Sequence, residues 1–283
     1  MEIFLDASNA RQILKARPNG VGRRAIEVSL DLNLAQTQLE ASNETFQHGD
    51  QSFAFEPLEA IATGGRKCFR KVDDEPWAPL EVFDGKFHQL VATSRAPSLE
   101  IDGVQMHRTA EIEPFQGALD WARAVVRPGD FVLDTCGGLG YTAIHAARLG
   151  ASRVLSTELS ESVIRLRELN PWSRLERGLA LELQHGDIFA LLARLPSGSL
   201  DSAIHDPPRY SLAPELYSGA FYVRLHDALK PGGRCFHYTG APYSRGRGRD
   251  FLGGVVSRLG GAGFRVTMRP ELQGLVAVKR HGR

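Results

Sequence analysis

The stretch VLDTCGGLGYTAI, residues 132–144, indicates the fold of the second part of this 283-residue chain. Its apolar start ends in an acid, Asp134, and glycines at 137, 138 and 140 precede a segment with apolar residues at helical spacing. Glycine lets the backbone turn tightly and lets a ligand come close to it. The stretch therefore predicts a strand, a turn and a helix, although a glycine-rich turn alone is weak evidence for a binding site.

The alternation of strand and helix continues around this stretch, from about residue 112 to the C-terminus. Strands are expected at 130–135, 152–159, 179–187, 200–206 and 233–240, with segments of helical periodicity between them. Such alternation implies an α/β fold with a doubly wound, mainly parallel sheet and right-handed crossovers. The last segments are interpreted as a helix followed by a closing pair of strands.

The first part of the chain has a different pattern. Apolar residues alternate over 25–34, which is the period of a half-buried strand, and further short apolar runs follow between Gly, Asp and Pro. A short helix is expected before them, at 9–17. We therefore expect a small β-rich domain at 1–110, which covers the substrate side of the cleft, and an α/β domain at 111–283.

Composition excludes several classes of protein. Apolar residues make up 42% and charged residues 24% of the chain, and the net charge is +1. No apolar run approaches the roughly 18 residues of a membrane helix, and the start lacks the pattern of a signal peptide. Three cysteines lie far apart without a CxxC pair, so neither a disulfide framework nor a zinc site is indicated. We expect a cytoplasmic protein without a metal.

Acids stand at the ends of three successive predicted strands, where ligands bind in open α/β sheets. A carboxylate at Glu158 can accept both ribose hydroxyls of an adenosine, and Asp187 can accept the adenine amino group with Ile188 beside the ring. Together with Asp134, these residues favour a nucleoside-containing ligand. The alternative is that the acids only cap the following helices, because both local sequences suit an N-cap.

On these features the chain resembles the class I S-adenosylmethionine-dependent methyltransferases, from residue 113 to about residue 280. GLGYTAI, NPWSR, HDPPR, HYTG and the β-rich front part resemble a group of predicted methyltransferases common in archaea. The resemblance implies S-adenosylmethionine as cofactor and a Rossmann-like sheet. NAD is disfavoured, because CGGLGY lacks the GxGxxG spacing: the position three after Gly138 is Tyr141. The cofactor-binding residues that it implies are Asp134, Thr135, Cys136, Gly137, Gly138, Gly140, Tyr141, Glu158, Leu159, Asp187 and Ile188.

The motif DPPR follows the fourth predicted strand. In amino methyltransferases a (D/N)PP(Y/F/W) tetrad orients the target amine through its first side chain and the first proline carbonyl, and its aromatic residue stacks on the acceptor ring. The resemblance thus implies catalytic roles for Asp206 and Pro207. Arg209 replaces the aromatic residue and is always charged. Three roles stay open for Arg209: binding an anionic group of the substrate, pairing with an acid such as Glu215, or lying over a flat ring.

Further candidates lie at the same strand ends. His205 is predicted to take a proton from the acceptor, since the ordinary pKa of histidine is near 6.5. The alternative for His205 and His237 is a packed ring satisfied by the backbone. Trp172 lies either at the rim of the adenine pocket or in a core. The predicted substrate-binding residues are Pro208, Tyr210, His237, Tyr238 and Arg245.

These features favour methyl transfer to a nitrogen of an RNA base or of a small, anionic molecule. The expected partner is accordingly RNA or a small-molecule substrate, and a homodimer is left open. An aminopropyltransferase of the spermidine synthase type is the first alternative, but such enzymes read GGGDG where this chain reads CGGLG. A non-catalytic cofactor-binding protein is the second.

Overall fold

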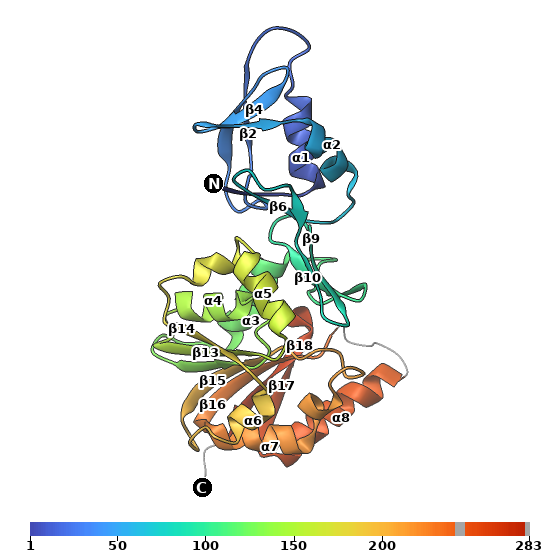
Figure 1. The fold of residues 1–283 in the computed structure, drawn as a ribbon. Helices are drawn as coiled ribbons and strands as arrows, with labels where there is room; N and C mark the ends of the chain where they lie inside the picture. Colours follow the sequence, from blue (N-terminus) through green and yellow to red (C-terminus); the bar gives the residue numbers. More distant parts are fainter. Residues whose placement is uncertain (241–246, 281–283) are drawn as a thin grey trace. The chain divides into compact units, whose positions relative to one another are not determined.

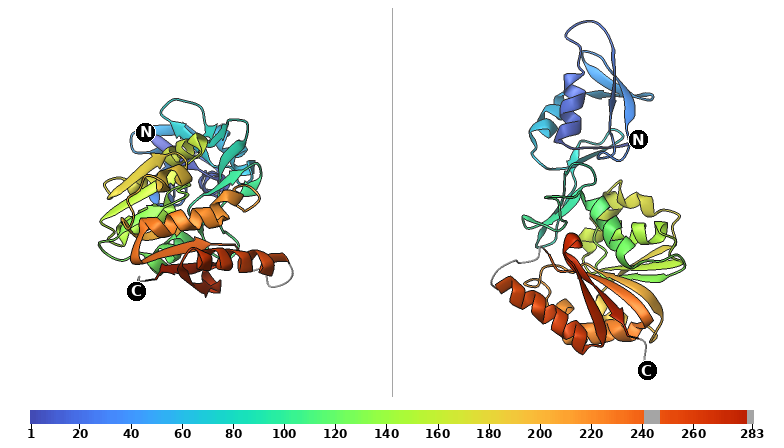
Figure 2. Two further views of the ribbon diagram at one scale, coloured as in Figure 1. Left: turned by 90° about the horizontal axis from the view of Figure 1, so that it is seen from below. Right: turned by 180° about the vertical axis from the view of Figure 1, so that it is seen from behind.

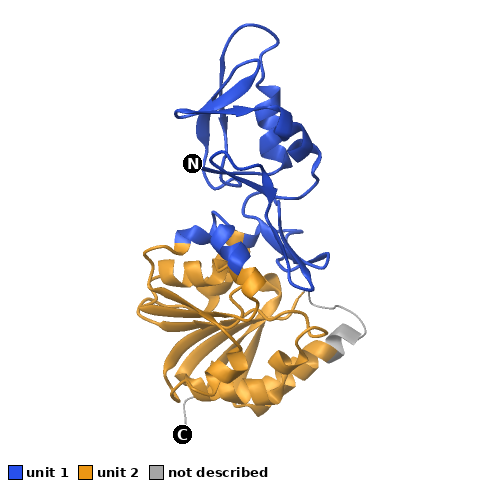
Figure 3. Ribbon diagram, viewed as in Figure 1, with its two compact units in different colours: residues 1–114, 165–175 blue, residues 115–164, 176–283 orange. Residues whose placement is uncertain are grey.

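The computed structural model describes residues 1–240 and 247–280, and side chains in all of these except 247–250. The chain forms two compact units (Figure 3). Unit 1 comprises Met1–Pro114 and Arg165–Leu175, and unit 2 comprises Phe115–Ile164 and Glu176–Arg283. Within the described residues, no helix combines the length and the apolar character of a membrane span.

Unit 2 is built on a seven-stranded sheet with the order β14-β13-β12-β15-β16-β18-β17 (Figure 1). Neighbouring strands are parallel except at β18, which is antiparallel to both β16 and β17. The expected α/β fold with a mainly parallel sheet is therefore confirmed. The strands are β12 (Phe131–Asp134), β13 (Arg153–Glu158), β14 (Leu181–His185), β15 (Leu200–His205), β16 (Leu229–Tyr238), β17 (Phe264–Arg269) and β18 (Gly274–Lys279).

Helices cover both faces of this sheet, with α3, α4 and the start of α5 on one face and α6, α7 and α8 on the other (Figures 1 and 2). Adjacent strand residues point to opposite faces. Val132 packs with Trp121 in one core, whereas Leu133 packs with Phe221 in the other. Burial on both faces explains the unbroken apolar run that precedes Asp134 in β12. The helical elements are α3 (Pro114–Val125), α4 (Tyr141–Arg148), α5 (Glu161–Leu169), η1 (Ser173–Glu176), α6 (Ile188–Leu192), η2 (Pro214–Tyr217), α7 (Gly219–Ala228), α8 (Arg247–Gly261) and η3 (Pro270–Leu272).

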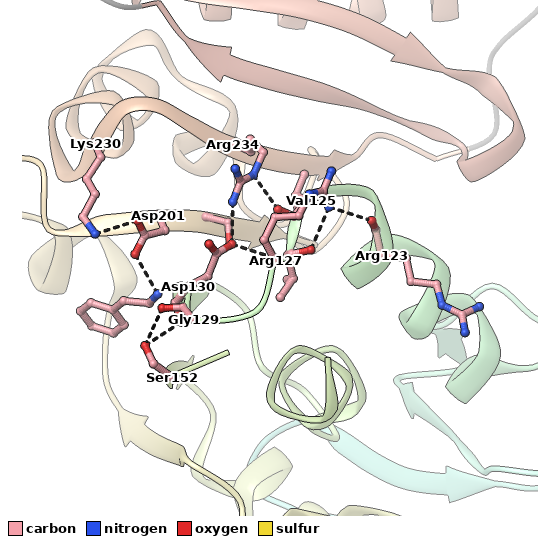
Figure 4. A network of polar contacts seen from close by, with 12 residues as sticks. Arg123, Val125, Arg127, Gly129, Asp130, Ser152, Asp201, Lys230 and Arg234 are labelled. Atoms are coloured by element: carbon pink, nitrogen blue, oxygen red, sulfur yellow. Dashed lines mark hydrogen bonds and ion pairs between the residues drawn. The ribbon is translucent and has the colours of Figure 1, made fainter. Parts of the chain in front are cut away.

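A polar network joins the beginnings of the central strands (Figure 4). Asp130 accepts a hydrogen bond of 2.6 Å from Arg234. Asp201 accepts one of 2.7 Å from Lys230 and one of 2.9 Å from the Phe131 amide. These contacts tie β12, β15 and β16 together and support the sheet away from the carboxyl ends of its parallel strands.

Residues 1–114 of unit 1 form three small antiparallel sheets and the helices α1 and α2. The short helix expected at 9–17 is α1, at Ala7–Lys15. The sheet orders are β1-β6-β7, β2-β3-β4-β5 and β11-β10-β9-β8. The elements are β1 (Glu2–Leu5), α1 (Ala7–Lys15), β2 (Arg24–Val28), β3 (Thr37–Ala41), β4 (Thr45–His48), β5 (Gln51–Ala54), α2 (Glu56–Thr63), β6 (Phe69–Val72), β7 (Ala78–Pro79), β8 (Glu81–Phe83), β9 (Phe87–Val91), β10 (Ser98–Ile101) and β11 (Val104–Gln105).

The strand expected at 25–34 is shorter than predicted. β2 ends at Val28, and the next residues form a turn in which Leu32 has φ 55°. The Ser29 hydroxyl accepts a hydrogen bond of 2.8 Å from the Asn33 amide, and Asp31 accepts one from the backbone four residues later. Side chains that bond the nearby backbone compete with a strand, and here they end it despite the apolar alternation.

Trp172 belongs to the core of unit 1, so the core interpretation of this residue is correct. It is 2% exposed, and its Nε1 donates a hydrogen bond of 2.8 Å to the Leu32 carbonyl. The guanidinium of Arg95 lies 5.4 Å from its ring. Two residues later, Arg174 forms an ion pair with Glu2. These contacts explain why the segment Arg165–Leu175 groups with unit 1.

Candidate functional site

Three acids meet around the glycine loop at the carboxyl edge of the unit 2 sheet. Asp134 ends β12, Glu158 ends β13, and Asp206 follows β15. Because these strands are parallel and adjacent, their ends lie along one edge. The Cys136 thiol is a shared neighbour: burial raises its pKa well above the ordinary value, and the charges of Glu158, Asp206 and Asp134 add to the rise. The structure thus brings together predicted residues that are far apart in sequence.

The glycine loop is held against these strands. Gly138 and Gly140 have φ of 49° and 82°, a conformation that other residues adopt only with strain. The Gly137 amide donates to the Thr157 carbonyl over 2.6 Å. The fully buried Asp134 accepts hydrogen bonds of 3.0 Å from Thr142 and 2.8 Å from Ser156. Asp134 is therefore satisfied within the fold and places a fixed negative charge beneath the loop.

Asp187 makes the backbone contact that the capping alternative foresees, whereas Glu158 does not: α5 is capped by Ser160, whose hydroxyl accepts a hydrogen bond from the Val163 amide. The two oxygens of Glu158 accept 2.9 Å hydrogen bonds from the amides of Gly138 and Ser160. Asp187 caps α6 by accepting a hydrogen bond of 2.8 Å from the Phe189 amide. A carboxylate oxygen has two lone pairs. Both acids can therefore cap a helix or loop and still accept ligand hydroxyl or amino groups.

A hollow of about 550 Å³ opens beside Asp187 and next to Leu159, the residue that follows Glu158. Leu159 is 69% exposed there, and the guanidinium of Arg224 lies 4.6 Å from the Phe189 ring. Ile188 is buried in the core beneath. An uncovered leucine next to a carboxylate suits a flat, partly apolar group such as a purine. The lining residues are Leu159, Asp187, Phe189, Ala190, Glu215 and Arg224.

Asp206 and Pro207 follow β15 and present two hydrogen-bond acceptors at this edge. Neither the half-buried Asp206 carboxyl nor the Pro207 carbonyl has a hydrogen-bond donor among the residues that the structure describes. The next carbonyl, of Pro208, accepts 2.9 Å from the Tyr217 hydroxyl. Burial raises the pKa of Asp206 to about 8, and the nearby Asp134 carboxylate contributes. The pair is thus arranged to receive donors from a ligand.

Arg209 and Tyr210 lie on the surface just after this pair. Within 1–240 and 247–280, the Arg209 guanidinium has neither an ion pair nor a hydrogen bond, so the alternative of a pair with Glu215 is not observed. Tyr210 is 49% exposed, and its ring makes edge contacts with Tyr217 at 5.6 Å and Phe251 at 5.5 Å. Binding an anion and lying over a ring remain the two roles for Arg209.

The two histidines predicted at the strand ends, His205 and His237, are fully buried. His205 Nε2 lies 3.0 Å from the Leu216 carbonyl, so it carries the proton, and Nδ1 accepts 2.7 Å from the Thr135 hydroxyl. Burial lowers the pKa of His205 to about 4. His237 Nε2 contacts the Tyr222 hydroxyl at 2.9 Å, and burial holds its pKa well below the ordinary value. His205 matches the packed-histidine alternative, because both of its nitrogens are hydrogen-bonded and neither is free to accept a proton. His237 is packed as well, but among the described residues its buried Nδ1 has no hydrogen-bond partner.

The remaining predicted residues are Tyr141, Tyr238 and Arg245. Tyr141 is 2% exposed and packs edge-on against Phe115 at 5.4 Å. Tyr238 is half-buried, with its ring 4.8 Å from that of Trp121. Arg245 lies outside the described residues. Among those described, no group of His, Cys, Asp or Glu side chains is arranged to hold a metal ion.

Sequence reasoning missed several residues that shape the site. Thr142 and Ser156 hold Asp134, and Tyr217 holds Pro208. Phe189 and Arg224 line the hollow. Helical periodicity carries a weak signal for Arg224, because a lone arginine on α7 is compatible with any exposed face. No local signal exists for Tyr217, because its partner is defined only by the tertiary fold.

This strand order, with a glycine loop and acids at the strand ends, defines the class I S-adenosylmethionine-dependent methyltransferase fold, which spermidine synthases share. A spermidine synthase bound to the transition-state analogue AdoDATO matches with a TM-score of 0.57 and 16% identity, over 73% of this chain and 76% of that chain. The spermidine synthase of Thermotoga maritima matches with a TM-score of 0.55 and 15% identity, over 73% and 75%. At this identity the likeness concerns the fold alone.

Sequence comparison places the chain more narrowly. No family model matches it. The uncharacterized protein MJ1233 of Methanocaldococcus jannaschii is 37% identical over 287 residues, which is 98% of this chain and 95% of that protein. The chain therefore belongs to the same family as MJ1233.

Proposed function

We propose that the protein is an S-adenosylmethionine-dependent methyltransferase that modifies a nitrogen atom. The observation that carries this proposal is that the Asp206 carboxyl and the Pro207 carbonyl have no hydrogen-bond donor among the described residues. Both lie at the edge of the sheet where the strands that end in Asp134 and Glu158 also stop. A scaffold protein has no need for a half-buried acid held without a partner, because burying a polar group without a hydrogen bond is costly.

The cofactor-binding residues fit the proposed cofactor. Glu158 has lone pairs left for ribose hydroxyls, Asp187 has them for an amino group, and the hollow with exposed Leu159 accommodates a purine. Gly138 lacks a side chain and has open space where a Cβ would lie, so a ligand can approach its backbone. S-adenosylmethionine supplies an electrophilic methyl group when bound. Asp134 contributes negative charge that favours a cationic ligand.

Asp206 and Pro207 would orient the acceptor. An amino group that donates one hydrogen to each oxygen has its lone pair directed away from both. Because Asp206 is followed by two prolines, the chain is held extended and stiff at this point. Alignment of the reacting groups can lower the activation free energy by up to about 7–11 kcal/mol, so a stiff DPPR turn would favour the reaction. At neutral pH the raised pKa leaves much of Asp206 protonated, and its carbonyl oxygen still accepts a hydrogen bond.

The acceptor is an RNA base or a small molecule, and Arg209 favours one with an anionic group. Guanidinium groups pair well with phosphate and carboxylate, and Arg209 has no protein partner among the described residues. Unit 1 is proposed to cover the acceptor. An aminopropyl transfer is not favoured, because the loop position that carries an acid in GGGDG is Leu139, which is 1% exposed.

Transfer of labelled methyl tests the proposal. Purified protein would be incubated with methyl-tritiated S-adenosylmethionine and either total RNA or a small-molecule extract. We expect label in one fraction, and a loss of about a hundredfold or more in Asp206→Ala with cofactor affinity retained. Equal transfer by Asp206→Ala would show that DPPR is structural.

A further inference from the structure

The DPPR turn is fixed by a residue that lies outside it. The Tyr217 hydroxyl donates a hydrogen bond of 2.9 Å to the Pro208 carbonyl. Tyr217 is 4% exposed, and its ring lies 5.6 Å from that of Tyr210 and 5.4 Å from that of His237. A hydrogen bond in such a closely packed place restrains the carbonyl that accepts it.

Tyr217 is itself held from two sides through the backbone of η2. From α8, Arg258 Nε donates a hydrogen bond of 2.7 Å to the Tyr217 carbonyl. From the end of β15, His205 Nε2 donates 3.0 Å to the Leu216 carbonyl while Nδ1 accepts from Thr135 of the glycine loop. The hydroxyl of Tyr217 is therefore fixed relative to both the sheet and the glycine loop.

The prolines carry this restraint back to Asp206. Each proline fixes its own φ, and a residue before a proline is kept out of the helical region. Few backbone torsions are then left free between the Pro208 carbonyl and the Asp206 carboxyl. Fixing the Pro208 carbonyl thus also limits how the Pro207 carbonyl can turn and where the Cα atom of Asp206, from which the carboxyl extends, can lie.

We propose that Tyr217 is a positioning residue that acts through Pro208 to hold the Asp206 carboxyl and the Pro207 carbonyl toward the acceptor. The role toward an acceptor rests on the proposed function. The effect of Tyr217 on the position of Asp206 does not depend on the proposed function. The positioning of Asp206 and the role in catalysis can therefore be tested separately.

The chain offers a matched pair of variants. Tyr217→Phe removes the hydroxyl that contacts Pro208, and Tyr222→Phe removes one that contacts His237, each at 2.9 Å. Both tyrosines are buried, with exposures of 4% and 0%. The two substitutions should therefore lower the free energy of unfolding by similar amounts. Tyr217→Phe alone removes a hydrogen bond to the DPPR turn. Thermal unfolding of both variants would establish that each is folded.

The first measurement is the titration of Asp206, followed by NMR in protein labelled with carbon-13 at the aspartate carboxyls. Asp206→Asn assigns the signal. Asp134 is the charged group that faces Asp206, and Glu158 and the Cys136 thiol lie around them. If Tyr217 holds the carboxyl in place, Tyr217→Phe lets it move toward water, and its pKa falls by about one unit. Tyr222→Phe should leave the pKa unchanged. An equal pKa in wild type and Tyr217→Phe would overturn the proposal.

The second measurement is turnover with tritiated S-adenosylmethionine and the RNA or extract fraction that takes up methyl. Tyr217→Phe should lower kcat about tenfold, the scale of one lost hydrogen bond, with an unchanged KM for S-adenosylmethionine. An equal kcat in the two variants would also overturn the proposal. If the wild type methylates neither fraction, the proposed function fails, and the titration still decides whether Tyr217 positions Asp206.

Discussion

Replacing Asp206 with asparagine should stabilise the folded protein at neutral pH. The substitution preserves shape and removes only the ability to ionise. Burial, with a contribution from Asp134, raises the pKa of Asp206 from 3.8 to about 8. The folded protein therefore resists ionisation of this carboxyl, while the unfolded chain does not. An uncharged side chain at this position avoids that cost.

The magnitude follows from linkage between protonation and folding. Between 3.8 and pH 7 lie about 3 pKa units, which correspond to at most about 4 kcal/mol. Solvent reaches the half-buried carboxyl and screens part of this effect, so we expect about 2 kcal/mol at pH 7. For a unit of this size, that corresponds to a rise of about 4–8 °C in the unfolding midpoint.

The sign of the pH dependence is also defined. Because the folded pKa lies above the unfolded one, the carboxyl destabilises the fold increasingly as pH rises from about 4 to about 8. Below this window it is protonated in both states, and above it the penalty is complete. The stabilisation by Asp206→Asn should therefore grow from pH 5 to pH 8 and then level off.

Scanning calorimetry at several pH values provides the measurement, and Asp201→Asn provides a control of opposite sign. Burial alone would raise the pKa of Asp201, but hydrogen bonds from Lys230 and the Phe131 amide, with the Lys230 and Arg234 charges, lower it overall. Asp201→Asn should hence destabilise at pH 7, and the loss should shrink toward acid pH. If Asp206→Asn gave no gain at pH 7 over pH 5, the inferred burial of the carboxyl would be refuted.

Two further predictions concern binding. Glu158→Ala should weaken S-adenosylmethionine binding by about tenfold or more in calorimetry, as expected for a lost hydrogen bond to a charged group, whereas Glu182→Ala, which removes an exposed pair with Arg153, should not. Unchanged affinity in Glu158→Ala would remove this residue from the site. Arg209→Lys should raise the KM for the acceptor, because lysine cannot make a planar two-point contact. Arg265→Lys, at an exposed position of β17, serves as control. A silent Arg209→Lys would exclude recognition of an anionic acceptor by this side chain.

The sheet was predictable from sequence because its strands are buried on both faces. Runs such as residues 131–134 are apolar up to the acid that ends them, so both the strand and its exposed end can be recognised. Parallel pairing then brings Asp134 and Glu158 to one edge, and no further information is needed. The turn after Val28 was not predicted, because Ser29 and Asp31 end the strand through hydrogen bonds that apolar alternation does not reveal.

The hydrogen bonding and the protonation of the site residues depend on partners that are distant in sequence. The sequence predicts His205 as a base because it ends a strand, but in the structure Thr135 and the Leu216 carbonyl occupy both of its nitrogens. The raised pKa of Asp206 arises from burial and from Asp134, 72 positions earlier in the printed sequence. Such contacts are set by packing, so motif and spacing alone cannot supply them.

Methyl transfer is tested most directly by comparing two donors. One reaction contains S-adenosylmethionine labelled in its methyl group, and the other contains decarboxylated S-adenosylmethionine labelled in its aminopropyl chain, each with RNA or with small-molecule extract. We expect wild-type protein to transfer methyl label alone, and Asp206→Ala to transfer almost none. Transfer of the aminopropyl label, or methyl transfer that persists in Asp206→Ala, would contradict a methyltransferase that uses Asp206 to orient its acceptor.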